Sequence, residues 1–312
     1  MDKKDLRVIF MGTPEISAYV FEAMILDGYK FVGLIAQPDR PVGRKNEIEK
    51  VPTKVVAEKY NIPVFQPLKI RKEYDFVKEL NPDVIITLAY GQIVPQGLLD
   101  IPQFGCLNLH GSLLPKYRGA APIQYALINN EEKTGMTLMK MVAEMDAGPM
   151  YAQKEVVIEK EDNSTSLFQK MAVAAKELIL ESLPLYIDGK LPEVEQDVSK
   201  VTFCPTIKPE EEKLDLSKDV KSIYGWIRGL SDHPGAYFFL DGKKLKVFKA
   251  EVINELESGE IGEIVQADKR GLVVQCKGGQ LSLLELQKEG KNKMDYKSFL
   301  NGNQGLLGKK LD

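Results

Sequence analysis

Short apolar segments alternate with helical patterns along the first half of the chain, and this alternation restricts the possible folds more than any other feature. Leu6–Met11, Phe31–Ala36 and Val84–Leu88 have the length and composition of buried strands, and the amphipathic stretch Glu15–Asp27 separates the first two. Strands that alternate with helices form right-handed crossovers and a mostly parallel, twisted sheet. We therefore predict an α/β fold here. Further strands are expected at Val64–Phe65 and Leu107–Leu109, and further helices at Thr53–Tyr60 and Arg71–Leu80.

The turn after the first expected strand contains Gly12, Thr13 and Pro14. Thr13 is a suitable helix cap, Pro14 suits the first helical position, and Gly28 can end the helix. A strand, a glycine and a helix in succession also occur in dinucleotide-binding folds. The turn lacks the full G-x-G-x-x-G pattern, however, so this signal is weak.

The pattern changes in the second half of the chain. Met136–Val142 and Tyr151–Ile158 follow each other without a helix, which predicts an antiparallel edge or hairpin, and Ser164–Tyr186 predicts a long helix. After residue 209, short alternating runs are separated by turns, which is typical of a small all-β barrel or sandwich. We expect a helix at Leu216–Leu230 and strands at Ala236–Leu240, Leu245–Val252, Ile261–Gln266, Leu272–Gln275 and Leu281–Leu286.

Length and composition favour two domains in a cytoplasmic chain. The 312 residues suggest a first domain at 1–189, a linker at 190–208 and a second domain at 209–312. The 42 basic and 45 acidic side chains leave a net charge of −3, so only local Lys and Arg clusters can bind nucleic acid. Cys106, Cys204 and Cys276 lack metal-ligand spacing, which predicts reduced thiols and no metal site. We expect no membrane contact, because no apolar stretch reaches the length of a span or signal peptide.

His110 and His233 are the only histidines that the sequence offers for acid–base chemistry. His110 follows Asn108 by two positions, so strand alternation places both side chains on one face. In open α/β sheets, sites lie at the carboxyl ends of the strands, where His110 is expected. An amide can donate to an oxygen that gains negative charge, and imidazole transfers protons at neutral pH. Taken alone, the pair also fits two structural polar residues, and we expect His233 to be structural or on the surface.

The next stretch of sequence resembles a family signature. Asn108 and His110 are followed by Ser-Leu-Leu-Pro and then by Tyr117-Arg118-Gly119, an arrangement similar to that of the folate-dependent formyltransferases. The segment around Asp146, with Gly148 two residues later, is similar to the part of that family in which an Asp completes the site. The resemblance runs from Val8 to Phe299. It implies that Asn108, His110 and Asp146 are catalytic, in a Rossmann-like domain with a C-terminal OB-like β-barrel domain.

The resemblance also implies a formyl donor, 10-formyltetrahydrofolate, and no metal. Two segments are similar to the loops that border the folate in this family: a strand-end loop whose glycine lets the backbone approach a flat ring, and the Ser-Leu-Leu-Pro stretch. The implied donor-binding residues are Tyr90, Gly91, Gln92 and Ile93 in the first segment, and Ser112, Leu113, Leu114 and Pro115 in the second.

Other features resemble the branch of the family that acts on initiator tRNA. The Gly119–Gln124 stretch and the C-terminal domain are similar to that branch, and the basic loop Gln37–Lys45 looks like its inserted tRNA-binding loop. Glu47 and Glu49 depart from that pattern, and a solvated charged surface is the alternative at each basic position. The implied tRNA-binding residues are Arg40, Arg44, Lys45, Lys243 and Lys246.

We therefore expect a monomeric enzyme that transfers the formyl group of 10-formyltetrahydrofolate to the α-amino group of methionine on initiator Met-tRNA. Formylation of an amino-sugar nucleotide is the alternative within enzymes, and it predicts activity without tRNA. A catalytically silent nucleotide- or RNA-binding module is the alternative from another class. The intact set of Asn108, His110 and Asp146 argues against that second alternative.

Overall fold

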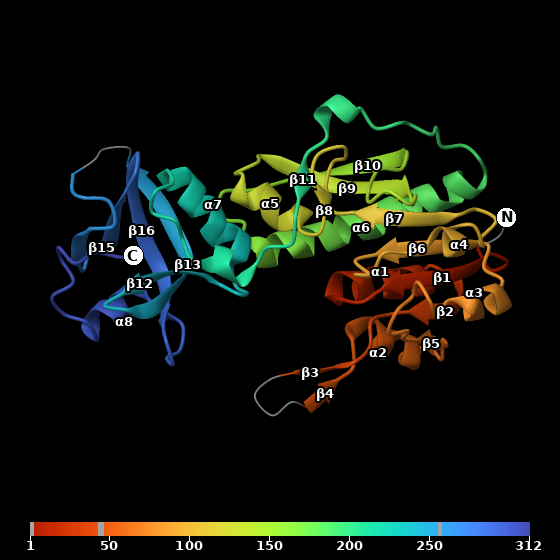
Figure 1. The fold of residues 1–312 in the computed structure, drawn as a ribbon, viewed down its shortest axis with the longest axis horizontal. Coiled ribbons are helices and arrows are strands. Elements are labelled where there is room, and N and C mark those ends of the chain that lie inside the picture. The colour runs from red at the N-terminus through yellow and green to blue at the C-terminus, as the bar shows by residue number, and fades with distance from the viewer. Residues whose placement is uncertain (1–2, 43–46, 255–257) are drawn as a thin grey trace. The chain divides into compact units, whose positions relative to one another are not determined.

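A computed structural model describes residues 3–42, 47–254 and 258–312, and the chain divides into two compact units (Figure 1). The first unit comprises Met1–Gly119, Thr134–Val157 and Phe168–Cys204. The second comprises Ala120–Lys133, Ile158–Leu167 and Pro205–Asp312.

The elements up to the end of the first unit are, in chain order, β1 (Arg7–Gly12), α1 (Glu15–Leu26), β2 (Lys30–Ile35), β3 (Arg40–Val42), β4 (Glu47–Glu49), α2 (Pro52–Lys59), β5 (Val64–Phe65), α3 (Asp75–Leu80), β6 (Val84–Leu88), α4 (Gln96–Leu99), β7 (Cys106–His110), β8 (Arg118–Gly119), α5 (Pro122–Ile128), β9 (Lys133–Lys140), β10 (Met150–Val157), α6 (Ser164–Ile187), the 3₁₀ turn η1 (Val198–Lys200) and β11 (Phe203–Cys204). The remaining elements are η2 (Pro209–Glu212), α7 (Val220–Leu230), β12 (Ala236–Leu240), β13 (Lys243–Asn254), β14 (Ile264–Asp268), β15 (Gly271–Cys276), β16 (Gly279–Lys288), β17 (Met294–Asp295) and α8 (Tyr296–Asn301).

The first unit is built on a seven-stranded sheet with the order β10-β9-β7-β6-β1-β2-β5 (Figure 1). The pairs β1–β2, β1–β6, β6–β7 and β2–β5 are parallel, whereas β9 is antiparallel to β7. The predicted parallel sheet with an antiparallel edge is confirmed. The chain proceeds from β1 towards β5 on one side and then from β6 outward on the other, so the order reverses between β1 and β6. Ligands of such sheets bind beyond the carboxyl ends of the strands at this reversal.

Both faces of the sheet are buried along its central strands β1 and β6, which explains why these two strands are almost entirely apolar. On one face Phe10 of β1 stacks on Phe21 of α1 with ring centroids 4.9 Å apart, and Phe31 of β2 meets Phe21 edge-on at 4.8 Å. On the other face a second cluster contains residues of β1, β6, β7 and α4. Its buried members are Ile9, Met11, Ile35, Ile70, Val77, Ile85, Tyr90, Val94, Leu98, Leu99 and Cys106.

Thr13 does not cap α1, contrary to our expectation. Pro14 is the N-cap residue and makes no side-chain capping bond. The Thr13 hydroxyl instead accepts a hydrogen bond from the Gln37 main-chain N–H (3.2 Å) and donates to the Tyr90 carbonyl (3.4 Å). It therefore connects the loops that follow β1, β2 and β6 at the carboxyl end of the sheet.

The basic loop after β2 begins and ends as an antiparallel hairpin, β3–β4, in which Arg40 pairs with Glu49 and Pro41 with Ile48. Figure 1 shows this hairpin extending away from the sheet of its unit. Arg40 is exposed, and Ile48 is 76% exposed although its side chain is apolar. The hairpin presents both a basic and an apolar side chain to solvent.

The second unit contains an antiparallel sheet with the order β12-β13-β16-β15-β14, and β17 pairs with β16. Residues 309–312 join its two edges. The Phe239 N–H of β12 donates to Asp312 (2.8 Å), and the Leu311 N–H donates to Gly262, two residues before β14 (2.9 Å). A sheet whose edges are connected in this way has a barrel-like arrangement. The helix expected from Leu216 begins instead at Val220, because the Asp219 carboxylate caps it.

All three cysteines are buried thiols. Burial raises the pKa of the Cys106 and Cys276 thiols to about 12, so both are neutral, unreactive side chains.

Candidate active site

His110 and Asp146 lie together at the carboxyl end of β7. The His110 ring is 5% exposed, and its Nε2 is 2.8 Å from the Tyr117 carbonyl oxygen. Its Nδ1 is 3.6 Å from Oδ1 of Asp146. We assign a ring proton to Nε2, because a carbonyl only accepts hydrogen bonds. The Nδ1 atom therefore faces the carboxylate, and in the neutral ring it carries a lone pair.

The Asp146 carboxylate is held by the main chain of the family signature. Its Oδ2 accepts a hydrogen bond from the Gly119 N–H at 2.9 Å, which leaves Oδ1 directed at the imidazole. Gly119 has φ +126°, and a Cβ there would lie 2.5 Å from the Cys204 carbonyl oxygen. Only glycine fits between these two segments, and this steric restriction explains why the signature has a glycine at position 119.

Asn108 lies on the same face of β7 as His110, paired with Thr87 of β6 and Met139 of β9. In the described part of the chain, no residue forms a hydrogen bond with its half-buried side-chain amide. The Thr87 hydroxyl on the neighbouring strand and the Tyr90 hydroxyl just beyond it are buried, and neither has a partner among the described residues.

The first expected donor-binding segment is anchored by Gln37. The Gln37 side chain donates to the Tyr90 carbonyl at 3.0 Å and accepts from the Gln92 amide at 3.2 Å. Burial, followed by the nearby Glu73, raises the pKa of Tyr90, so its hydroxyl stays protonated. Gly91 is exposed with φ +90°, and Ile93 is 54% exposed. The contacts of these residues with a donor stay a prediction.

The second expected donor-binding segment is fixed mainly through its main chain. The Ser112 hydroxyl donates to the Lys116 carbonyl at 2.6 Å, so it is used within the loop. Thr137 of β9 donates to the Ser112 carbonyl (2.7 Å) and accepts from the Leu114 N–H (3.2 Å). Leu114 is buried and is joined to Pro115 by a cis peptide bond, and Leu113 is half-buried. This loop can therefore contact a ligand through its main chain but not through the Ser112 hydroxyl, which is already used within the loop.

Sequence reasoning missed a group of residues beside Asp146. Within the segment that we expected to be a linker, Gln196 is 7% exposed and the Thr202 hydroxyl accepts from the Tyr117 N–H at 2.9 Å. β11 of the same segment pairs with β8 of the signature. Arg118, which is 6% exposed, donates to the Gln196 side chain at 3.0 Å. Turn-rich sequence without periodicity predicts a linker, and no pattern in it indicated these contacts.

The expected tRNA-binding residues have different surroundings. Arg40 is exposed on β3 and Lys243 is exposed at the start of β13. The Lys246 ammonium donates to the Pro234 carbonyl at 2.5 Å. Arg44 and Lys45 lie outside the described residues. His233 is exposed in the second unit, as expected.

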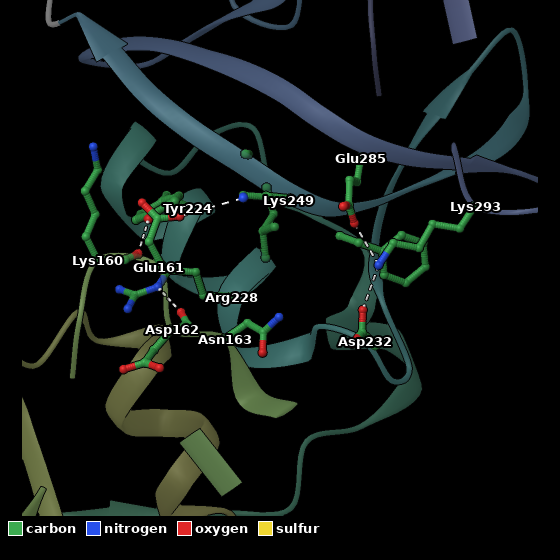
Figure 2. A pocket seen from close by; sticks show the side chains of 13 residues that line it. Lys160, Glu161, Asp162, Asn163, Tyr224, Arg228, Asp232, Lys249, Glu285 and Lys293 are labelled. Atoms are coloured by element: carbon green, nitrogen blue, oxygen red, sulfur yellow. Dashed lines mark hydrogen bonds and ion pairs between the residues drawn. The ribbon is translucent and has the colours of Figure 1, made fainter. Parts of the chain in front are cut away.

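The second unit contains a polar pocket of about 270 Å³ in which positive and negative side chains are paired (Figure 2). Lys293 lies between Asp232 (2.9 Å) and Glu285 (2.7 Å), and Figure 2 shows both contacts. The Lys293 ammonium lowers the pKa of the Asp232 carboxyl. Lys249 is 3.7 Å from Glu161. Because carboxylates compensate these cations, the pocket has no excess of positive charge for a phosphate.

Two kinds of feature are missing from the part of the chain that the structure describes. No group of three or more His, Cys, Asp or Glu side chains could hold a metal ion. No described helix combines the length and the apolar character that crossing a bilayer requires.

Comparison with known sequences identifies the family. The profile of the formyl transferase family matches residues 6–183, and the profile of the formyl transferase C-terminal domain matches residues 206–304. The chain belongs to the formyl transferase family. The resemblance in the signature is therefore confirmed, and the matched regions contain Asn108, His110 and Asp146 as well as most of the second unit.

One curated relative and two solved structures extend this result. The methionyl-tRNA formyltransferase of Bacillus cereus (strain G9842) is 46% identical over 309 residues, with 98% of each chain covered. The structure of an N-formyltransferase from Helicobacter canadensis, with folinic acid and dTDP-3-aminofucose, has a TM-score of 0.67 at 16% identity and covers 91% of this chain and 99% of its own. HypX from Aquifex aeolicus, with tetrahydrofolic acid, has a TM-score of 0.66 at 17% identity over 97% of this chain. The chain spans about half of HypX (48%), and both solved structures share its fold.

Proposed function

We propose that this chain transfers the formyl group of 10-formyltetrahydrofolate to the α-amino group of methionine on initiator Met-tRNA, giving N-formylmethionyl-tRNA for translation initiation. The observation that carries the proposal is the 46% identity to a methionyl-tRNA formyltransferase across 98% of both chains, which includes the second unit as well as the site. The pairing of His110 with Asp146 supports the chemistry, because it supplies a base next to a carboxylate.

The folate supplies a formyl group bound to nitrogen, and the protein residues promote its transfer. The Asn108 amide donates to the formyl oxygen as that oxygen gains negative charge. Such a donor accelerates acyl transfer by about 10²–10³-fold.

His110 is the proposed base. With one proton held on Nε2 by the Tyr117 carbonyl, Nδ1 is the basic ring nitrogen, and the proton that the attacking amine loses reaches it through the Asp146 carboxylate or a water molecule beside it. The Asp146 carboxylate, 3.6 Å away, stabilises the imidazolium that forms, and the proton then passes to the leaving nitrogen. Catalytic hydrogen bonds are often long without substrate and shorten in the complex, which fits this separation.

We further propose that the tRNA contacts the exposed Arg40, together with Arg44, Lys45, Lys243 and Lys246, and that the second domain (209–312) follows a linker at 190–208. We propose that the protein acts as a monomer, with His110, Asp146 and their supporting residues in one chain. A cytoplasmic location matches a substrate that serves translation. Size-exclusion chromatography with light scattering tests the monomer, and limited proteolysis tests the boundaries.

A substrate comparison tests the proposed function. The purified protein is incubated with 10-formyltetrahydrofolate and either initiator Met-tRNA or a dTDP-amino sugar, and the blocked amine is identified by mass spectrometry. We expect formylation of Met-tRNA alone. Formylation of the amino sugar without tRNA would instead assign the chain to the sugar-modifying members of the family.

A further inference from the structure

The main chain at Asp146 adopts a conformation that its surroundings must maintain. Asp146 has φ +52°, in the left-handed region, which residues other than glycine keep only where neighbouring groups fix it. Two residues later Gly148 passes so close to β9 that a Cβ would lie 1.9 Å from the Lys140 carbonyl oxygen. Asp146 therefore points at His110 only while this turn keeps its shape.

One side chain donates to both carbonyls of this turn. Gln196 Nε2 lies 2.7 Å from the Asp146 carbonyl oxygen and 2.8 Å from that of Gly148. These two bonds use both N–H groups of the amide. The residue is 7% exposed, so water cannot easily replace it as the donor. The bonds span Asp146, and a change in either one would move the carboxylate.

The other end of the Gln196 amide is tied to the signature segment. Its Oε1 accepts from Arg118 Nε at 3.0 Å, and Arg118 also donates to Glu144 at 3.3 Å, two residues before Asp146. Gly119, the next residue after Arg118, donates to the Asp146 carboxylate at 2.9 Å. Gln196 thus connects the main chain of the Asp146 turn to the segment that holds its side chain.

We propose that Gln196 is a positioning residue for formyl transfer, which sets the distance between the Asp146 carboxylate and the His110 imidazole without contacting substrate itself. The inference rests on the proposed function, because it assigns work to Asp146 in that reaction.

The test uses Gln196→Glu, which keeps the size of the side chain and its acceptor for Arg118. The change removes both donors and places an oxygen against two carbonyl oxygens. A displacement of about 1 Å in a catalytic group lowers turnover about 10²-fold. We expect a decrease in kcat of that size, with KM for Met-tRNA and for 10-formyltetrahydrofolate within about threefold of wild type. If this variant does not fold, Gln196→Met removes the same bonds without adding charge.

Gln275 in the second unit provides a matched control. It is 1% exposed, and its Nε2 donates to two carbonyls, those of Cys276 (2.9 Å) and Gly279 (3.0 Å). Gln196→Glu and Gln275→Glu each remove two buried donors, so both variants should lower the melting temperature by a similar amount. Gln275→Glu should leave kcat within about twofold of wild type. Comparing the two variants separates loss of stability from loss of positioning.

A double variant decides whether Gln196 acts through Asp146. In single-turnover assays, adding Gln196→Glu to Asp146→Ala should lower the rate no further, because the carboxylate to be positioned is gone. A second decrease of similar size, or a Gln196→Glu variant with wild-type kcat beside an inactive Asp146→Ala, overturns the positioning role and leaves the proposed site intact. Wild-type turnover in Asp146→Ala instead refutes the site itself, and the inference with it.

Discussion

Replacing Gly119 by alanine adds one methyl group, and this change should move the Asp146 carboxylate relative to the His110 imidazole. The new Cβ would lie 2.5 Å from the Cys204 carbonyl oxygen, and ordinary contact begins at 3.4 Å. The two segments must therefore move apart by about 0.9 Å. The Gly119 N–H holds the Asp146 carboxylate at 2.9 Å, so the movement is transmitted to the group that faces His110.

The expected loss has a conformational part and a catalytic part. Alanine at φ +126° destabilises the fold by about 1–2 kcal/mol, which lowers the melting temperature by about 2–8 °C. Displacement of the carboxylate by nearly 1 Å lowers kcat by about 10²-fold, equivalent to about 2.7 kcal/mol in the barrier. Steady-state formylation of Met-tRNA measures the second part, and calorimetry measures the first.

Gly28→Ala is the matched control. Gly28 has φ +96°, and apart from Gly28 and its two chain neighbours no heavy atom of the described residues lies within 4 Å of the position that the new methyl group would take. This variant should show the conformational destabilisation with turnover close to wild type. If Gly119→Ala also keeps wild-type kcat, or if both variants lose activity in proportion to stability, the link from Gly119 through Asp146 to catalysis is refuted.

Three further predictions concern the amide, the hairpin and the charged pocket. Asn108→Asp keeps the size of the side chain but removes the amide donor, so initial rates should give a kcat about 10²–10³-fold lower; a smaller loss than about threefold excludes the role in charge stabilisation. Arg40→Ala should raise the KM for Met-tRNA and reduce its salt dependence by about one phosphate contact, and an unchanged salt slope would leave Arg40 a solvated surface charge. Lys293 lowers the folded-state pKa of Asp232, so this pair stabilises the fold above the unfolded pKa of about 3.9 and stops doing so as pH falls through the folded pKa. The melting temperature of Asp232→Asn should lie about 1–2 °C below wild type at pH 7, with the gap closing as pH falls below the unfolded pKa of about 3.9 towards the lowered folded pKa; a gap independent of pH contradicts the ion pair.

Much of the fold can be predicted from the sequence because its strands are buried on both faces. Val84–Leu88 and Leu107–Leu109 are apolar runs bounded by turns, and the structure places them in neighbouring parallel strands. The helix starts were less accurate. Asp219 caps α7, which begins at Val220, four residues after the expected start, and Thr13 bonds to loops rather than to α1. Both differences depend on which hydroxyl or carboxylate finds a main-chain N–H, which periodicity does not encode.

Part of the candidate site could be predicted from strand alternation and from the resemblance to a family motif. Strand alternation places Asn108 and His110 on one face, but only the resemblance indicated that Asp146 would lie beside them. Gln196 had neither kind of signal. Its contacts depend on a long-range path, since residues 194–204 return to the signature segment through β11. Irregular segments carry their information in tertiary hydrogen bonds, so a linker and a supporting segment have the same local sequence character.

The proposed mechanism depends on one geometric claim, that Asn108, His110 and Asp146 surround the formyl carbon of the bound donor. A crystal structure of the protein with 10-formyltetrahydrofolate, in the absence of Met-tRNA, measures this directly. We predict that the formyl oxygen lies about 3 Å from the Asn108 amide nitrogen, within hydrogen-bonding distance, and that the formyl carbon lies beside the His110–Asp146 pair. A formyl group bound beyond hydrogen-bonding reach of the Asn108 amide and away from the His110–Asp146 pair would contradict the mechanism.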